Sequence, residues 1–327
     1  MGEAQVEIEK IVGSLGDKYT RYLPPAKYRS IVDAATGTLA GVGVEISTDK
    51  DTGTIFVSDT EPSSPASNGG IQKGDVFLEV DGVRFDDGKG TPDEVASKLR
   101  GPMGSKVGIV MKRNGNTQDF ILTREPITIT SVRSYLSEKN GVGKVGVIRI
   151  KSFSGTTTAT VKDAYDDLKS KGATSFVLDV RGNPGGLLPG GVDTAGLFLE
   201  ANKPVVFVVD KKGMTDNQST YQDGIDLESP LAIVVNGNTA SAAEVMTAAL
   251  KENQRAVVVG EQTFGKGIIQ TIRQLGYDNG GVAVTVAKYE TPLHNNINKS
   301  GIAVDISAEC NGEDAAVCVP TSALTRK

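Results

Sequence analysis

The second half of the chain alternates between apolar runs of strand length and amphipathic runs of helical length. After Pro126 this pattern predicts strands at Val145–Ile150 and Ser175–Val180, with a helix at Thr157–Lys171 between them. Near-continuous apolar strands joined by helices are typical of a parallel sheet covered on both faces, so we predict an α/β core. The alternation continues with a helix at Gly191–Leu199, strands at Val205–Val209 and Leu231–Val235, a helix at Ser241–Asn253, a strand at Ala256–Val259, and a hairpin of Ile268–Leu275 and Gly281–Tyr289.

The preceding segment has a different texture. From Leu39 to Glu125, short β-type runs are punctuated by glycine, with one helical stretch at Pro92–Leu99. Two short helices, at Val6–Leu15 and Lys27–Ala35, are expected ahead of this module. We therefore predict a helical segment over residues 1–38, a β-rich module over residues 39–125, and the α/β core over residues 126–327.

The composition excludes several classes of protein. The 327 residues carry 35 basic and 40 acidic side chains, a net charge of −5 without a basic stripe, which argues against a nucleic-acid partner. The longest apolar runs hold about six residues, far fewer than the ~20 that a membrane-spanning helix needs. A structural zinc site needs about four N or S ligands, whereas the chain has one histidine, His294, and two cysteines. We expect neither a metal nor an organic cofactor.

Two features bear on the compartment. Cys310 and Cys318 lie near the C-terminal end, where a disulfide closing a short loop and two unpaired thiols both agree with the sequence. The chain begins MGEAQVEIEK, without a basic and then apolar leader. Either the protein is cytosolic or a targeting segment is removed from it.

Ser241 and Lys266 are candidates for nucleophilic catalysis. Ser241 stands at the expected start of a helix, where main-chain N–H groups and the helix dipole favour a developing negative charge. The stretch Ser241–Glu244 is also a capping box, a structural alternative worth ~1 kcal/mol. Lys266 lies between two glycines and, by itself, is typical of a solvated surface lysine. If burial lowers its pKa, a neutral lysine can replace histidine as the general base for a serine.

Two glycine-rich motifs flank these candidates. Asp179–Gly186 follows a buried strand and ends in Gly185 and Gly186, whose amides could form half of an oxyanion hole. As a plain connection from strand to helix, the motif would carry no function. The segment Gly260–Gly267 lacks the spacing and the Lys-Ser/Thr ending of a phosphate-binding P-loop, so we reject nucleotide binding.

The string from Gly70 to Val83, a Gly-Asp turn feeding an alternating strand, resembles the signature of PDZ domains. The resemblance implies that the β-rich module holds the terminal carboxylate of a peptide in a glycine-rich loop and pairs the peptide with the following strand edge. The residues that this implies for the carboxylate-binding loop are Leu39, Gly41, Val42, Gly43 and Val44.

Taken together and in this order, the motifs resemble the carboxyl-terminal processing peptidases, the tail-specific family of serine proteases. The resemblance covers about Val6 to Ile306, nearly the whole chain. It implies a ClpP/crotonase-like α/β core with an inserted PDZ domain, and proteolysis near the free C-terminus of protein substrates. It rests on Asp17–Leu23, Gly41–Ile46, the PDZ string, Leu99–Pro102, Asp179–Gly186, Thr239–Glu244 and Thr263–Gly267.

The resemblance also implies roles for individual residues. The nucleophile falls on Ser241, the general base on Lys266, and the glutamine that orients the lysine on Gln270. The remaining implied roles are oxyanion donation by the amides of Ala242 and of Gly185 or Gly186, coupling of peptide binding to the active site by Arg100, a third catalytic carboxylate found in some members at Glu252, and a structural role for His294.

The chain departs from the usual family pattern at Ala243, where a second serine is common, and at Val304, where a proline is common. The Leu-His form of the segment ending at His294, and Cys310 after it, resemble the branch that trims the photosystem II D1 precursor in the thylakoid lumen. This implies protein substrates with a free apolar C-terminus, D1 precursor among them, a monomer or small homo-oligomer, and peripheral membrane association. A general tail-specific protease of the bacterial periplasm and a non-catalytic PDZ receptor are the alternatives.

Overall fold

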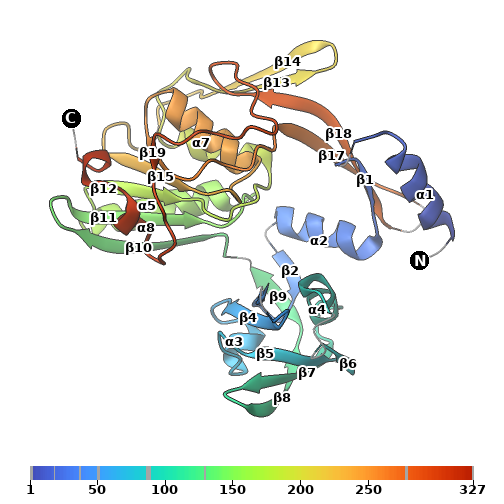
Figure 1. Cartoon of the computed structure of the whole chain (residues 1–327). Coiled ribbons are helices and arrows are strands. Elements are labelled where there is room, and N and C mark those ends of the chain that lie inside the picture. The colour runs from blue at the N-terminus through green and yellow to red at the C-terminus, as the bar shows by residue number, and fades with distance from the viewer. Residues whose placement is uncertain are drawn as a thin grey trace. The chain divides into compact units, whose positions relative to one another are not determined.

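The chain forms two compact units. The computed structural model describes residues 3–17, 19–36, 38–49, 52–85, 90–128, 130–276 and 279–325. One unit is Gly37–Thr130, and the other combines Met1–Thr36 with Ser131–Lys327. The N-terminal helices therefore belong to the same unit as the α/β core, and the β-rich unit is inserted between them in sequence. Figure 1 labels the helices and strands.

The larger unit is built on a six-stranded sheet in the order β10-β11-β12-β15-β16-β19. All neighbours are parallel except the edge strand β10, which runs antiparallel to β11 and lies outside the strands that the sequence predicts. The expected parallel α/β core is thus confirmed. Its strands are β10 Val132–Lys139, β11 Gly143–Ile150, β12 Ser175–Asp179, β15 Leu231–Val235, β16 Val257–Gly260 and β19 Ile306–Ser307.

Both faces of this sheet are buried. Ile148 and Ile150 of β11 pack in a cluster with residues of three helices, whereas Val145 and Val147 of the same strand pack against the C-terminal segment. Alternate residues of a strand point to opposite faces, so this division explains why most positions of the central strands are apolar. The helices are α5 Thr157–Ser170, α6 Leu188–Gly196 and α7 Ala242–Glu252 on the first face, and α8 Ala315–Cys318 on the second.

A second, antiparallel sheet extends the larger unit, with the order β1-β18-β13-β14 and β17 paired to β18. The sequence pattern was wrong in assigning Val205–Val209 to the parallel core, because this run lies in β13 and pairs with β14 and β18. The first residues of β13 are buried against the core. The strand therefore has an apolar run like that of a central parallel strand, and the sequence pattern does not distinguish the two. The strands are β1 Arg21–Leu23, β13 Pro204–Asp210, β14 Gly213–Ser219, β17 Ile268–Gln274 and β18 Gly281–Glu290.

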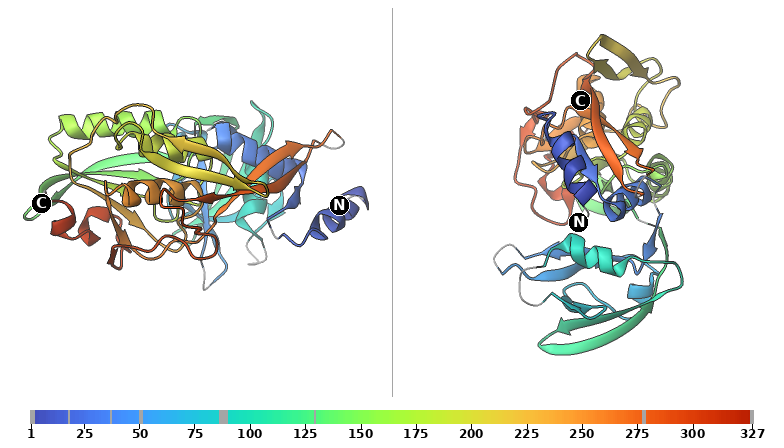
Figure 2. Two further views of the ribbon diagram at one scale, coloured as in Figure 1. Left: turned by 90° about the horizontal axis from the view of Figure 1, so that it is seen from above. Right: turned by 90° about the vertical axis from the view of Figure 1, so that its right-hand side faces the viewer.

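The N-terminal segment joins this second sheet. It consists of α1 (Glu3–Gly13), β1 and α2 (Pro25–Thr36), and Figure 2 shows α1 beside the β17–β18 hairpin. Arg21 pairs with Ala283 of β18. The Asp17 carboxylate accepts hydrogen bonds from Thr285 of β18 and from Thr20, which hold its pKa below the usual range. The turn before β1 is thereby fixed to the hairpin.

The smaller unit is a β module with a main sheet in the order β3-β4-β5-β7-β8 and a two-stranded sheet of β2 and β9. Strand β3 is an edge strand of the main sheet. Thr91 and Glu94 form a capping box at the start of α4. The elements are β2 Thr38–Gly41, β3 Val44–Thr48, β4 Ile55–Thr60, α3 Pro65–Asn68, β5 Val76–Val80, β6 Val83–Arg84, α4 Pro92–Leu99, β7 Lys106–Arg113, β8 Asn116–Thr123 and β9 Glu125–Thr128.

None of the helices in the described ranges is long and apolar enough to cross a membrane.

Candidate active site and peptide groove

Ser241 occupies a strained turn between β15 and α7. Its φ of 58° and ψ of −121° lie in a region that non-glycine residues rarely adopt. The turn is held from both sides, because Thr239 donates to the carbonyl of Val180 (2.8 Å) and the Ala240 amide donates to the carbonyl of Asn183 (2.9 Å). In the predicted capping box, the Glu244 side chain accepts from the Ser241 amide as expected. The Ser241 amide donates to Glu244 (2.8 Å), while the Glu244 amide donates to the main-chain carbonyl of Ser241 (2.8 Å), and the Ser241 hydroxyl makes no cap hydrogen bond within the described chain.

The Gly185–Gly186 segment lies against this turn. Gly185 has a φ of 100°, and a Cβ on it would stand 2.7 Å from Cβ of Ser241, so only glycine fits. The Gly185 amide is already used, because it donates to Oδ1 of Asn183 (2.8 Å). The amides of Gly186 and Ala242 have no acceptor among the residues that the structure describes.

Lys266 is fixed to the Ser241 turn by a buried carboxylate. Glu244 is fully buried and accepts four hydrogen bonds, two of which come from the amides of Ser241 (2.8 Å) and Lys266 (2.9 Å). The other two come from the Thr263 hydroxyl (2.6 Å) and the Gly265 amide (2.7 Å). The buried Tyr289 adds a second connection, since its hydroxyl lies 2.6 Å from the carbonyl oxygen of Lys266 and 3.3 Å from that of Ser241.

The environment of Lys266 favours its neutral form. Burial lowers the pKa of its ammonium group, and the positive charge of Arg21 lowers it further, whereas the Glu244 carboxylate acts in the opposite direction. Across the described ranges, no hydrogen bond or ion pair joins Nζ of Lys266 to another group, so its lone pair would be available once the proton is lost.

Within the described ranges, no hydrogen bond joins Gln270 to Lys266. Gln270 lies in β17, and its side-chain amide donates to the carbonyl of Tyr19 (2.7 Å) in the turn that leads to Arg21. Glu252, at the far end of α7, accepts from the Leu293 amide (2.8 Å) and from Asn295 (3.1 Å), which are loop contacts rather than contacts to Ser241.

His294 lies in the same loop as Leu293. Its ring stacks on Phe207 with centroids 4.1 Å apart, and Nδ1 lies 3.1 Å from a carboxylate oxygen of Glu290. These are packing and surface contacts, in agreement with the expected structural role. In the part of the chain that the structure describes, no group of histidine, cysteine or carboxylate side chains could hold a metal.

The smaller unit carries a groove of about 190 Å³ beside the open edge of β3. Its lining combines the glycine-rich loop with α4. Gly43 has a φ of 79°, and a Cβ on it would stand 2.3 Å from Cβ of Ser64, so the loop requires glycine here. The amides of Val42 and Gly43 donate to no group in the described ranges and are available to a carboxylate. The groove is lined by Gly41–Ile46, Glu61, Ala96, Leu99, Arg100 and Ile127.

Leu39, the remaining residue of the predicted loop, lies in β2, where it pairs with Ile127. The Gly-Asp turn of the PDZ-like string has a structural function. Asp75 is buried and binds the guanidinium of Arg113 (2.5 Å) and the amide of Gln72 (2.9 Å).

Comparison with known proteins identifies both units. Residues 144–308 match the profile of peptidase family S41, and residues 31–112 match the PDZ domain. A carboxyl-terminal-processing protease of Synechocystis is 39% identical over 93% of this chain and 70% of its own length. The chain belongs to peptidase family S41. It is a serine peptidase of the carboxyl-terminal-processing type, with a PDZ domain, as the sequence predicts.

Other S41 relatives come from chloroplasts and bacteria. Carboxyl-terminal-processing peptidase 2 of Arabidopsis thaliana chloroplasts is 36% identical over 93% of this chain and 60% of the relative. Among solved structures, a photosystem II D1 C-terminal processing protease matches with a TM-score of 0.60 and 34% identity, covering 94% of this chain and 83% of that one.

Sequence reasoning missed three residues that shape this S41 site. It assigned Glu244 only to a capping box, whereas the carboxylate also binds the Lys266 loop. It gave no role to Tyr289 or Arg21. The only signal for Glu244 is that a single acidic residue stands among apolar neighbours. Nothing in the sequence places Tyr289 or Arg21 beside Lys266.

Proposed function

We propose that Ser241 is the nucleophile and Lys266 the general base of this peptidase. The observation that supports the pair is the buried Glu244, which binds the amides of both residues and so fixes their main chains side by side. Neutral Lys266 would take the proton of the Ser241 hydroxyl as the oxygen attacks the scissile carbonyl. The resulting ammonium would protonate the leaving amine, and water would then release the acyl-enzyme.

We propose that the oxyanion hole uses the amides of Ala242 and Gly186. Of the two glycines that the sequence offered, Gly186 is favoured because the Gly185 amide already donates to Asn183. Gly185 instead supplies the close approach to Ser241. Preorganised main-chain donors of this kind stabilise the oxyanion of a tetrahedral intermediate, and the loss of one donor lowers the rate ~10²–10³-fold.

Gln270 would act on Lys266 through the turn that it holds. Its contact to the Tyr19 carbonyl fixes the segment that carries Arg21, and the charge of Arg21 helps to keep Lys266 neutral. Gln270 is thus proposed as a positioning residue rather than as a direct partner of the lysine.

In the PDZ unit, the free amides of Val42 and Gly43 would hold the substrate's terminal carboxylate. Its last residues would add a strand to the edge of β3. Arg100 lines the same groove, and its charge makes it the candidate for coupling occupancy of the groove to the catalytic unit.

The substrate proposed is the precursor of the photosystem II D1 protein, processed in the thylakoid lumen. The proposal is supported by the similarity to the D1 processing protease and to the cyanobacterial and chloroplast enzymes. A general tail-specific protease of the bacterial periplasm is the alternative. Bacterial relatives support only a general bacterial role, among them a carboxy-terminal processing protease of Bacillus subtilis at 34% identity. We further propose a monomer or small homo-oligomer that associates peripherally with the membrane that holds its substrate.

The test uses a peptide with a D1-like C-terminal extension, as free acid and as amide. The protein is incubated with each peptide, and mass spectrometry locates the cut. We expect cleavage of the free acid, much slower cleavage of the amide, and none by Ser241→Ala or Lys266→Ala. Wild-type turnover in either variant would refute the proposed dyad. Equal cleavage of acid and amide would refute carboxylate recognition.

A further inference from the structure

A buried ion pair stands at the start of the loop that leads to the oxyanion donors. Asp179, the last residue of β12, is fully buried and receives two side-chain hydrogen bonds from Arg181 (2.7 and 2.8 Å). Arg149 adds a third (2.6 Å) and also donates to the Arg181 carbonyl (3.2 Å). The proposed mechanism gives none of these charges a chemical role.

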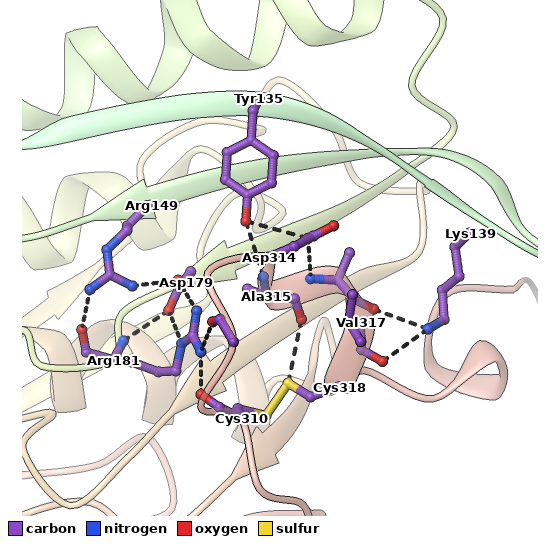
Figure 3. The surroundings of a disulfide bond; sticks show 12 residues. Tyr135, Lys139, Arg149, Asp179, Arg181, Cys310, Asp314, Ala315, Val317 and Cys318 are labelled. Carbon is purple, nitrogen blue, oxygen red and sulfur yellow. Dashed lines mark hydrogen bonds and ion pairs between the residues drawn. A yellow bond between two sulfur atoms is a disulfide. The ribbon is translucent and has the colours of Figure 1, made fainter.

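The same arginine holds the C-terminal loop. The guanidinium of Arg181 also donates to the carbonyl of Cys310 and to that of Gly312 (2.9 Å). Figure 3 shows Arg181 between Asp179 on one side and this loop on the other. The loop is closed by a disulfide between Cys310 and Cys318, whose exposure is intermediate. The carbonyls that Arg181 binds therefore lie in a segment whose ends are covalently tied.

The far side of the loop is anchored to the main sheet. The Asp314 carboxylate accepts from the Ser137 hydroxyl of β10 (2.6 Å), and Lys139 donates to the carbonyls of Ala316 (3.0 Å) and Val317 (3.3 Å). Ala316 is buried in the cluster on this face of the sheet. With the disulfide intact, this anchor and the Arg181 contacts are parts of one closed loop.

In the other direction, Arg181 leads directly to the proposed oxyanion donors. Asn183 follows two residues later, where its carbonyl accepts from the Ala240 amide (2.9 Å) and its side chain accepts from the Gly185 amide (2.8 Å). The amide of Gly182 donates to Asn236 (2.9 Å) in the turn before Ser241. A shift of Arg181 would move Asn183 and, with it, the peptide that presents the Gly186 amide.

We propose that Arg181 is a positioning residue for residues 181–186, the oxyanion loop, and that the disulfide-closed loop Cys310–Cys318 is the anchor of Arg181. The state of the disulfide would then set the turnover of the peptidase. The inference rests on the proposed Ser241 mechanism. Reduction of the disulfide by a dithiol transfers two electrons and two protons, giving two cysteine thiols and the cyclic disulfide of the reductant. The freed loop then no longer holds the Cys310 and Gly312 carbonyls at the guanidinium.

The experiment measures kcat and KM of peptide cleavage for the oxidised and the dithiol-reduced protein, for Arg181→Gln, for Arg181→Lys, and for the double variant Cys310→Ala/Cys318→Ala. A displacement of ~1 Å at a catalytic group costs about 10²-fold, and we expect a fall in kcat of that order for Arg181→Gln, with KM within about twofold of wild type. Arg181→Lys, which keeps a charge but not the fork of donors, should recover part of it. The reduced protein should lose about tenfold or more in kcat and regain it on reoxidation. The double variant should have the kcat of the reduced protein, and the dithiol should not change it.

Two controls separate positioning from general destabilisation. Arg255→Lys alters another arginine paired with an aspartate, Asp226, in the same unit but outside the oxyanion loop; the Arg255 side chain is 11% exposed. This substitution should lower the melting temperature and leave kcat of the folded protein unchanged. The affinity of a peptide aldehyde, whose adduct with Ser241 carries the oxyanion, should fall in Arg181→Gln in parallel with kcat. Binding of the free-acid peptide to the PDZ unit should remain.

The outcomes distinguish the two proposals. If the oxidised wild type shows no cleavage that depends on Ser241, the proposed function fails. If it cleaves, and neither reduction nor Arg181→Gln lowers kcat or aldehyde affinity, the positioning role is refuted. A loss in Arg181→Gln that is no larger than that in Arg255→Lys would likewise overturn it.

Discussion

Replacing Glu244 by glutamine tests the central feature of the site, because it keeps the shape of the side chain and removes its charge. The carboxylate accepts four hydrogen bonds, from the amides of Ser241, Gly265 and Lys266 and from the hydroxyl of Thr263. A glutamine must present its NH₂ group to two of these four donors. The cheaper orientation of the glutamine places its NH₂ group against Thr263 and Gly265. The Thr263 hydroxyl can turn to accept from this NH₂ group, whereas the Gly265 amide is left without an acceptor.

The cost follows from this count. One orphaned buried amide costs ~1–3 kcal/mol, and the three remaining bonds each lose about 1 kcal/mol when their acceptor is no longer charged. The sum is about 4–6 kcal/mol of unfolding free energy, or roughly 8–24 °C in melting temperature for a unit of this size. The charge also acts on Lys266. Because Glu244 raises the pKa of Lys266, its neutralisation should move the acid limb of the pH–rate profile to lower pH.

The assay combines thermal unfolding with kcat measured against pH on a peptide that wild type cleaves. Glu252→Gln is the matched control, since Glu252 lies on the same helix and also accepts two hydrogen bonds, but at a partly exposed loop. The control should change stability by less than about 1 kcal/mol and leave the profile in place. A Glu244→Gln protein with wild-type melting temperature and an unshifted profile would refute the role assigned to this carboxylate.

Three further changes are expected to act in defined directions. Activity should rise with pH as Lys266 loses its proton. Arg21→Gln should move that rise to higher pH, because it removes a positive charge that lowers the pKa of Lys266. A shift of the pH–kcat profile to lower pH would contradict this reasoning. Gly185→Ala should abolish cleavage, because the new Cβ would stand 2.7 Å from Cβ of Ser241, and retained turnover would exclude this packing. Gly43→Ala should weaken binding of a free-acid peptide at least tenfold, as judged by calorimetry, because its φ of 79° and close contacts admit only glycine.

The sequence was sufficient for the elements that carry a local signal. The runs Leu231–Val235 and Pro92–Leu99 form a strand and a helix with the predicted bounds, and the alternation of strands and helices predicts that the core sheet is parallel. Strand β10 is different, because Val132–Lys139 mixes apolar and charged residues at a sheet edge. Its pairing is determined by the strand that follows it rather than by its own pattern.

The candidate site also combines residues that carry a local sequence signal with contacts that carry none. Ser241 and Lys266 stand in motifs that their own neighbours define, so a sequence can nominate them. The contacts that join them are long-range: Tyr289 reaches both main chains from β18, and Gln270 binds Tyr19 across a separation of 251 positions. No local pattern encodes such contacts, since they depend on how the second sheet and the N-terminal segment meet the core.

The strained turn and the buried carboxylate explain each other. A non-glycine residue at φ 58° costs of order 1–3 kcal/mol and persists only where its surroundings fix it. Glu244 provides that restraint by accepting the Ser241 amide, which leaves the hydroxyl of Ser241 free of the capping role. The conflict between a capping serine and a nucleophilic serine is thereby resolved, because the glutamate and the main-chain carbonyl carry out the capping. Glu244 is fully buried and also accepts from the Lys266 amide, so the same carboxylate ties the main chain of the proposed base to that of the proposed nucleophile.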